Sequence, residues 1–393
     1  MPESSTISHF TSRRIIWVLS IVAVIFCGTF FIAQGKKSER LQPVAIDFDK
    51  QSLDVSQQIE DRYRHELYLL NGSAQSHFSS RMYRISQNEE YLQADVSESY
   101  RLASEISWLS NNMNARFIEQ WSKEKYKNYG IKLRSQLRKV SVEKNKEFLY
   151  YTNLLKILRR LDEYNLCHPQ VRVLEAAVSS YSYKPHLLDS TMIQAWAAQL
   201  ANYVYWLQQL GFSDYRADYA QAFRATYPDD KDSELSDQQY TNKVYGMTHI
   251  IFASSQYYQH NVRREKYSWI YDYFDNNIQQ ILARTKNDVI AEVGIAYQLA
   301  KVQGEHLNTL KHAIIKAVDH KQKMIPSVEG AFDFPSGKHR NTMAVILLSM
   351  SDSLYPGPHL AKLEKTASHL DPRFRHCDDA ESTVKSSLVS FDP

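Results

Sequence analysis

Apolar side chains recur at three- and four-residue steps along most of the chain, a spacing that is typical of helices. The first clear run covers residues 54–70 and places five large side chains at these steps: Val55, Ile59, Tyr63, Leu67 and Leu70. Similar runs begin at Asn88, Glu147, Asp189, Ser236, Glu265, Asn287, His306 and His339. No run alternates apolar and polar residues in the way of a half-buried strand. The pattern predicts an all-α domain.

Four of the predicted helices are apolar on nearly every side, so each must be surrounded by other helices. They centre near Leu200, Ile250, Gly294 and Ile346, roughly 44 to 52 residues apart. More polar helices lie between most of these neighbours, which is typical of helical-hairpin repeats. An α/α toroid, whose inner helices ring a central cavity, fits this contrast. An open α-solenoid of stacked hairpins is the alternative.

The first 40 residues carry a different pattern. Residues 15–33 form an uncharged, mostly apolar run of the length that crosses a bilayer as a helix, and Arg13 and Arg14 precede it. Lys36, Lys37 and Arg40 follow it and nearly balance the charge, so the short tail sets the expected orientation: tail inside, bulk of the chain outside.

The predicted organisation is therefore a cytoplasmic tail (1–14), a single inner-membrane anchor (15–33), a linker (34–56) and an all-helical periplasmic domain (57–393). Residues 33–35 resemble a signal-peptide cleavage site, so a cleaved and secreted form stays open.

Composition supports long helices and excludes one class of partner. Of 393 residues only 11 are Gly and 11 are Pro, which favours long helices over many short strands. The net charge of +3 argues against a dedicated nucleic-acid binder. The charge is uneven, however, because residues 123–146 hold nine Lys or Arg against Glu124 and Glu143. This stretch is either a solvated helix face or a contact for anionic lipid or an anionic polymer.

Familiar catalytic and metal-binding signatures are missing. The chain has no G-x-S-x-G, no H-E-x-x-H and no glycine-rich phosphate loop. The acidic run 229–237 has Leu235 where a calcium loop needs Gly, so we expect a solvated linker there. Cys167 and Cys377 lack zinc-site spacing, although they could pair with each other in an oxidising compartment. No cofactor and no metal are expected.

The most informative residues are polar ones inside apolar helices. His249 stands in the apolar run 243–259, on a helix predicted to begin at Ser236 with a capping box. Glu292 stands in a similar run, 287–300. A buried carboxylate costs several kcal/mol unless it has a partner or faces a wet cavity. Gly246 and Gly294, on the same two helices, predict close helix contacts, because Gly is otherwise costly within a helix.

In a toroid these two residues would face the central cavity, where a His and a carboxylate suffice for general acid–base catalysis. His249 and Glu292 are therefore the candidate catalytic pair. Four more residues are candidates for ligand binding: Tyr245, Asp288, His339 and Arg340. The stretch 329–340 is either a rim over the cavity or an ordinary surface loop. A purely structural network, with His249 hydrogen-bonded to Glu292 or to a carbonyl, is the competing interpretation.

The stretches "YGMTHIIFASSQYY" and "WIYDYFDNNIQQILARTKNDVIAEVGIAYQLA" resemble domain-of-unknown-function family 3541, found in marine gammaproteobacteria. The resemblance covers most of the chain from about Asp47 and is strongest over 240–300. It implies an exported or anchored helical domain and assigns no catalytic residues. Three hypotheses remain: a ligand-binding or scaffolding envelope protein, a toroid hydrolase or lyase acting on a glycan or other polar polymer, and a structural protein–protein module.

Overall fold

The computed structural model describes residues 48–127, 129–130 and 133–374. The predicted tail (1–14), the predicted membrane segment (15–33) and most of the predicted linker lie outside the described residues, as does Cys377. Within the described residues sixteen α-helices form and no β-strand, so the prediction of an all-α domain is confirmed. None of these helices combines the length and apolarity that crossing a bilayer requires.

The first half of the described chain holds α1 (Phe48–Glu66), α2 (Gly72–Ser86), α3 (Leu92–Ser110), α4 (Ala115–Tyr126), α5 (Leu133–Lys144), α6 (Phe148–Tyr164), α7 (Val171–Ser180), α8 (Lys184–Leu187) and α9 (Ser190–Gln209). The second half holds α10 (Arg216–Thr226), α11 (Asp237–Ser254), α12 (Ser268–Arg284), α13 (Asn287–Leu299), α14 (Glu305–Ala317), α15 (Phe334–Ser349) and α16 (Glu364–Ala367). Five short 3₁₀ turns lie between them: η1 (Leu67–Leu69), η2 (Glu89–Tyr91), η3 (Asp229–Glu234), η4 (Arg264–Tyr267) and η5 (Leu360–Lys362).

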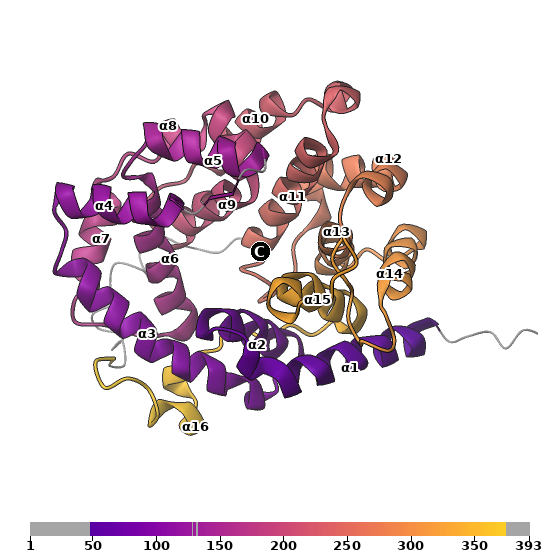
Figure 1. Ribbon diagram of the computed structural model, residues 1–393, viewed down its shortest axis with the longest axis horizontal. Coiled ribbons are helices and arrows are strands. Elements are labelled where there is room, and N and C mark those ends of the chain that lie inside the picture. The colour runs from indigo at the N-terminus through magenta and orange to yellow at the C-terminus, as the bar shows by residue number, and fades with distance from the viewer. Residues whose placement is uncertain (1–47, 128, 131–132, 375–393) are drawn as a thin grey trace, which may run out of the picture. The chain divides into compact units, whose positions relative to one another are not determined.

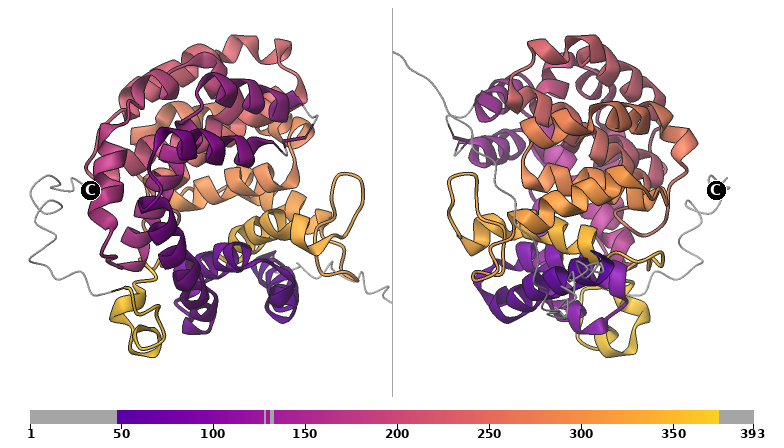
Figure 2. Two further views of the ribbon diagram at one scale, coloured as in Figure 1. Left: turned by 60° about the vertical axis from the view of Figure 1, so that its left-hand side comes forward. Right: turned by 90° about the vertical axis from the view of Figure 1, so that its right-hand side faces the viewer.

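Six helices follow one another around a common centre in Figure 1: α6, α9, α11, α13, α15 and α2. Each packs against the next in that order from α6 to α2. Between α2 and α6 the contact is polar, since Tyr164 Oη lies 2.8 Å from Ser76 Oγ. Helices such as α3, α7, α10, α12 and α14 pack on the outside of these six (Figure 1). Figure 2 shows α2 and α15 side by side, so early and late parts of the chain are neighbours.

The four helices that the sequence marked as apolar on every side are α9, α11, α13 and α15, and all four belong to this inner set. Two glycines explain how closely they pack. A Cβ at Gly246 would lie 2.5 Å from the Phe223 ring and 2.9 Å from Ala197 Cβ, and one at Gly294 would lie 2.5 Å from Leu347 Cδ1. Both predictions of close helix contact are confirmed.

Two helices begin earlier than the sequence indicates. Helix α1 starts at Phe48, within the segment assigned to the linker. Helix α15 starts at Phe334, where the Asp333 side chain accepts from Ser336 N and Pro335 sits in the first turn. The second half of the predicted loop 329–340 therefore forms about the first two turns of a helix.

The acidic run 229–237 is not simply a solvated linker. It forms η3, and within it Asp232 is buried. Asp232 Oδ1 and Asp229 Oδ1 each lie 2.7 Å from the ammonium of Lys243, which is completely buried on α11. The hydroxyl of Tyr273 donates to Asp232 Oδ2 at 2.6 Å. The prediction missed this cluster because Lys243 lies far enough from the run to look unrelated to it.

The predictions for the basic stretch 123–146 and for the cysteines can be compared with the structure only in part. In the basic stretch 123–146, Lys123 and Lys146 pair with Glu119 on the surface, whereas Arg138 packs over the Trp196 ring. Contact of this stretch with lipid or polymer stays a prediction. Cys167 is disulfide-bonded, and the other two cysteines of the chain lie outside the described residues.

Candidate functional site

A cavity of about 380 Å³ lies between the six inner helices, and every one of them contributes to its lining. Its volume falls within the range of about 300–1,000 Å³ that small-molecule sites occupy. The lining is polar and aromatic: Ser73, His77, Arg81, Arg84, Lys156, Arg159, Arg160, Glu163, Gln199, Asn202, Tyr203, Trp206, Tyr245, His249, Phe252, Tyr257, Tyr258, Glu292 and His339. Residues from 73 to 339 thus meet in one place.

Helix α11 supplies one wall through its helical period. Tyr245, His249 and Phe252 stand four and three residues apart, so they share one face. The ring centroids of Tyr245 and His249 are 4.5 Å apart, and those of His249 and Phe252 are 5.9 Å apart. One face of the helix that contains His249 is therefore turned to the cavity, and this explains the presence of a histidine within an apolar run.

The turn after α11 adds two tyrosines. The helix ends at Ser254, and Gln256, Tyr257 and Tyr258 then adopt φ values of 52°, 58° and 70°. Non-Gly residues rarely adopt this left-handed conformation, which costs of order 1–3 kcal/mol each. The turn brings both Tyr257 and Tyr258 into the cavity lining. A continued helix to Gln259, as the sequence pattern indicates, would not place them this way.

Glu292 is completely buried on α13 and has two partners. Thr248 Oγ1 donates to its Oε2 at 2.6 Å, and His339 Nε2 lies 3.2 Å from its Oε1. Tyr245 Oη lies 3.4 Å from the same His339 nitrogen. Burial raises the pKa of Glu292, although the hydrogen bonds from His339 and Thr248 act in the opposite direction. Because a hydrogen bond at 3.2 Å needs one proton between its atoms, the Glu292–His339 pair holds a proton.

His249 has one engaged and one free ring nitrogen. Its Nδ1 lies 3.2 Å from Asn202 Oδ1 and 3.1 Å from Tyr257 Oη. In this orientation of the amide, Asn202 Oδ1 can only accept, so Nδ1 carries the proton and Nε2 keeps a free lone pair. His249 Nε2 has no hydrogen-bond partner among the described residues, and Glu292 Oε1 is 3.8 Å away. Burial lowers the pKa of His249 well below its usual value, and His339 and Arg81 lower it further.

The opposite wall, from α2 and α6, is cationic. Glu163 lies within 3.3 Å of Arg84 and 3.1 Å of Arg160, and Arg159 is 3.7 Å away. Burial works to raise the pKa of Glu163, but the charges of these three arginines and of Arg81 outweigh it and lower that pKa to about 2. Glu163 is therefore a fixed anion that organises the arginines.

Two further cations on this wall have no carboxylate partner. Arg81 donates to the His77 carbonyl, and its guanidinium lies 5.2 Å from the Tyr257 ring centroid. It makes no ion pair among the described residues, and its Nε has no acceptor. Lys156 is exposed to the cavity and makes no ion pair in the described part of the chain either. In all, five Arg or Lys line the cavity against two carboxylates, so it favours an anionic occupant.

Four of the six residues singled out from the sequence line the cavity: Tyr245, His249, Glu292 and His339. The structure brings these four together. Arg340 does not line it, because its Nε donates to the Ile325 carbonyl at 3.1 Å on the far side of α15. Asp288 does not line it either, and acts on Glu292 only through its charge.

Sequence reasoning missed the residues of α2 and α6, and also Asn202 and Tyr257. The available signal was weak, because a charged helix face that borders a cavity has the same pattern as one that borders water. Within the described residues no group of three or more His, Cys, Asp or Glu has an arrangement that would hold a metal ion.

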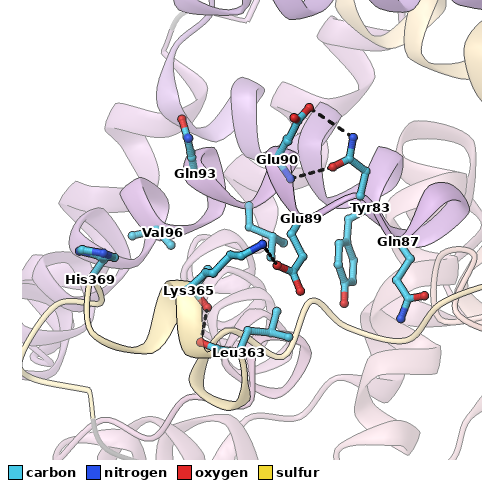
Figure 3. Close-up of a pocket in the computed structure, with 12 residues that line it drawn as sticks. Tyr83, Gln87, Glu89, Glu90, Gln93, Val96, Leu363, Lys365 and His369 are labelled. Carbon is cyan, nitrogen blue, oxygen red and sulfur yellow. Dashed lines mark hydrogen bonds and ion pairs between the residues drawn. The ribbon is translucent and has the colours of Figure 1, made fainter.

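A second hollow, of about 810 Å³, lies at the surface between η2, the start of α3 and the segment 363–369 (Figure 3). Its charged residues are exposed and paired: Lys365 Nζ lies 2.9 Å from Glu89, and Glu90 meets Arg64 at 2.6 Å. Surface pairs of this kind contribute little energy and recognise little. Although this hollow is larger, it offers no buried unpaired group, so the central cavity is the candidate site.

Comparison with known proteins gives a family and no activity. A family model described as "Domain of unknown function (DUF3541)" matches residues 52–374. The chain therefore belongs to this family, as its sequence resemblance indicated. No curated protein matches the chain. No solved structure matches it.

Proposed function

We propose that this member of the family is a membrane-anchored envelope protein whose helical domain is an α/α toroid that binds an anionic carbohydrate in its central cavity. The observation that carries the proposal is the cavity itself. It gathers five cations, of which Arg81 and Lys156 have no carboxylate partner among the described residues. Arg81 Nε is moreover buried without an acceptor among the described residues, and a buried polar atom left without a partner is typical of a functional site.

The toroid is supported by the order of helix contacts. The six inner helices pack in sequence from α6 to α2, and Tyr164 bridges α6 to Ser76 on α2. An open solenoid would separate its first and last hairpins. Here α2 and α15 pack together and His77 of α2 and His339 of α15 have ring centroids 5.7 Å apart.

A carbohydrate is supported by the mixture of side chains. The cavity has six aromatic residues: Tyr203, Trp206, Tyr245, Phe252, Tyr257 and Tyr258. Aromatic faces pack against the C–H faces of sugar rings, and their polar tips hydrogen-bond hydroxyl groups. The cations add selectivity for a sugar that carries a carboxylate or another anionic group.

The envelope location is supported by the sequence of residues 13–33 and by the disulfide at Cys167, which persists in oxidising compartments. Its test is protease treatment of intact and of outer-membrane-permeabilised cells. Digestion of the helical domain only after permeabilisation supports a periplasmic domain. Protection until the inner membrane is broken contradicts it.

The binding proposal is tested by calorimetry on the full-length protein in detergent. Oligosaccharides of uronic acids should bind, and neutral oligosaccharides of equal length should bind far more weakly. Arg81→Gln should weaken binding about 10- to 100-fold, since it removes a charge-assisted contact. Lys365→Gln, at the surface hollow, is the matched control and should leave the affinity unchanged. Equal affinity for neutral and anionic sugars would contradict the proposal.

A second candidate, catalysis, is favoured by one specific observation. A binding site needs no general base, yet His249 Nε2 keeps a free lone pair at 3.8 Å from a carboxyl group that shares a proton with His339. A base and a proton source side by side are the components of acid–base catalysis.

A further inference from the structure

We infer that the cavity cleaves a uronate-containing polysaccharide by β-elimination, with His249 Nε2 as the base, Arg81 facing the sugar carboxylate and the Glu292–His339 pair returning a proton to the leaving oxygen. This inference rests on the proposed binding of an anionic carbohydrate and names its reaction. It is drawn from how protons and charges are distributed over the cavity walls.

Hydrolysis fits the cavity less well. Glycoside hydrolases generally use two carboxyl groups, one as acid and the other as base or nucleophile. Among the carboxyl groups of the described residues, only those of Glu163 and Glu292 line this cavity, and Glu163 is enclosed by Arg84, Arg159 and Arg160. An anion held by three arginines neither gives up a proton nor attacks carbon readily. One carboxyl group therefore remains for chemistry.

β-Elimination needs a different set of groups, a cation beside the sugar carboxylate and a base beside C5, and the cavity contains both. The hydrogen on C5 of a uronate is acidified when a cation neutralises the neighbouring carboxylate, and it must be taken by an unprotonated base. Arg81 is a cation without a carboxylate partner among the described residues, and its guanidinium lies 5.2 Å from the ring centroid of Tyr257, whose hydroxyl contacts His249 Nδ1. This chain of contacts links the unpaired cation to the His249 ring, whose Nε2 has no partner among the described residues.

The step balances without any co-reactant. His249 Nε2 takes the C5 proton, and the C5–H electron pair becomes the second bond between C4 and C5. The C4–O bond breaks, and its oxygen leaves with the neighbouring sugar and takes a proton from the Glu292–His339 pair. The proton on His249 then passes across the 3.8 Å gap to Glu292 Oε1, which restores both groups.

The protonation states support these roles. Burial, His339 and Arg81 all lower the pKa of His249, so it is neutral and able to accept at neutral pH. Burial raises the pKa of Glu292, which favours a proton on the pair that must give one up. Burial and the charge of Glu292 raise the pKa of Tyr245, so its hydroxyl stays protonated and acts as a hydrogen-bond donor.

The geometry also selects the sugar. His249 Nε2 and His339 Nε2 both approach the same oxygen of Glu292, at 3.8 and 3.2 Å. Base and proton source therefore work on one face of the sugar ring. In glucuronate and mannuronate the C5 hydrogen and the C4 oxygen lie on the same face, whereas in galacturonate and guluronate they lie on opposite faces. The first two are the expected substrates.

The experiment follows the short-wavelength ultraviolet absorbance of the new C4=C5 bond, which is conjugated to the carboxylate. Full-length protein in detergent is incubated with polymers of mannuronate, glucuronate, galacturonate and guluronate, and binding of each is measured separately by calorimetry. Absorbance should rise with the first two polymers. His249→Gln should lower kcat about 100-fold or more, because a positioned base contributes about 10²–10⁴-fold.

Two variants separate chemistry from folding. His249→Gln should still bind the polymer and unfold at a similar temperature, so its loss is in kcat. Arg81→Gln should lower kcat and raise KM together, since Arg81 touches the carboxylate in both states. Lys365→Gln at the surface hollow is the control. In heavy water, wild-type protein with a bound uronate should exchange the C5 proton, and His249→Gln should not.

Each contrary outcome contradicts a specific part of the inferred mechanism or of the proposed function. Binding without any absorbance change overturns elimination and leaves the proposed binding function intact. New reducing ends without absorbance mean hydrolysis and overturn it too. Faster cleavage of galacturonate or guluronate overturns the one-face assignment. No binding of any anionic polymer overturns the proposed function and this inference with it.

Discussion

Lys243 and His249 lie six residues apart on α11, and the buried charge around them is organised in two different ways. Lys243 is enclosed: two aspartates accept from its ammonium, and the Tyr273 ring lies 4.3 Å from it. His249 borders a cavity, and one of its nitrogens has no partner among the described residues. We call Lys243 and its partners the closed cluster, because protein groups surround its charge. We call His249 and the polar groups around it the open cluster, because it contains a buried nitrogen without a hydrogen-bond partner among the described residues.

The difference shows which buried charges hold the fold together. A closed cluster gives each buried charge an oppositely charged neighbour, so removing that neighbour leaves a charge uncompensated in the protein interior. An open cluster already bears that cost in the native protein, at about 1–3 kcal/mol for each unpaired buried group. Removing a member of the open cluster should therefore cost little stability and remove function instead.

Replacing Lys243 by Met should produce the largest loss of stability. Among the described residues it leaves Asp232 buried with only the Tyr273 hydroxyl as a side-chain donor, and breaking a buried pair costs about 3–5 kcal/mol. Lys231→Met is the matched control, because Lys231 pairs with Glu234 on the surface and such pairs contribute about 0–1 kcal/mol. Urea unfolding midpoints measure both. Equal losses of stability in the two variants would show that the buried Lys243 pairs stabilise the fold no more than a surface pair does.

Two isosteric substitutions test the comparison directly. Asp232→Asn should cost about 2–3 kcal/mol, since it removes the charge that Lys243 and Tyr273 hold. Glu292→Gln should change stability by less than about 1 kcal/mol, or increase it, because burial already disfavours its charge. If Glu292→Gln lowers stability as much as Asp232→Asn does, Glu292 has a structural role. That result would favour the interpretation of His249 and Glu292 as a purely structural network.

Acidification should lower the stability of the folded protein through His249, a member of the open cluster. His249 has a lowered pKa in the folded state, so below about pH 6.5 the unfolded chain takes up a proton that the folded chain does not. Stability should fall by up to about 1.4 kcal/mol for each pH unit from this residue alone. His249→Gln should reduce that slope. The charged and titrating groups around it are Arg81, His339 and Glu292. An unchanged slope in the variant would show that His249 is protonated in the folded protein.

Thr248→Val should have a small effect, about 1 kcal/mol, since it removes one neutral donor from Glu292. Because that hydrogen bond favours the ionised carboxylate, its loss should raise the pKa of Glu292 further. NMR titration of the Glu292 carboxyl carbon measures the direction. A lowered pKa would contradict the assigned hydrogen bond.

Most of the fold could be predicted from apolar spacing, and the exceptions have a common cause. Helices α9, α11, α13 and α15 were recognisable as inner helices because they are apolar on every side. Helices α2 and α6 are also inner, yet the sides that line the cavity carry His77 and Arg81 in one case and Lys156 and Glu163 in the other. A charged face borders water in both situations, and sequence spacing does not tell a cavity from the outer surface.

The site could be predicted only in part, for reasons of local geometry. His339 and Arg340 are adjacent, but successive residues of a helix point about 100° apart, so only one lines the cavity. Tyr257 depends on a left-handed turn of non-Gly residues, which no turn signal in the sequence marks. His249 and Glu292 were identifiable because a polar residue within an apolar run needs a physical explanation.

The cavity walls come from residues as far apart in sequence as Ser73 and His339, and this has a consequence for how the protein is made. Contacts of such long range form late in folding, because the chain entropy of closing the loop must be overcome first. The binding surface is thus complete only when α15, the last helix that lines the cavity, is in place. Any ligand that binds it binds the completed chain alone, and so draws newly synthesised molecules toward the finished state by mass action.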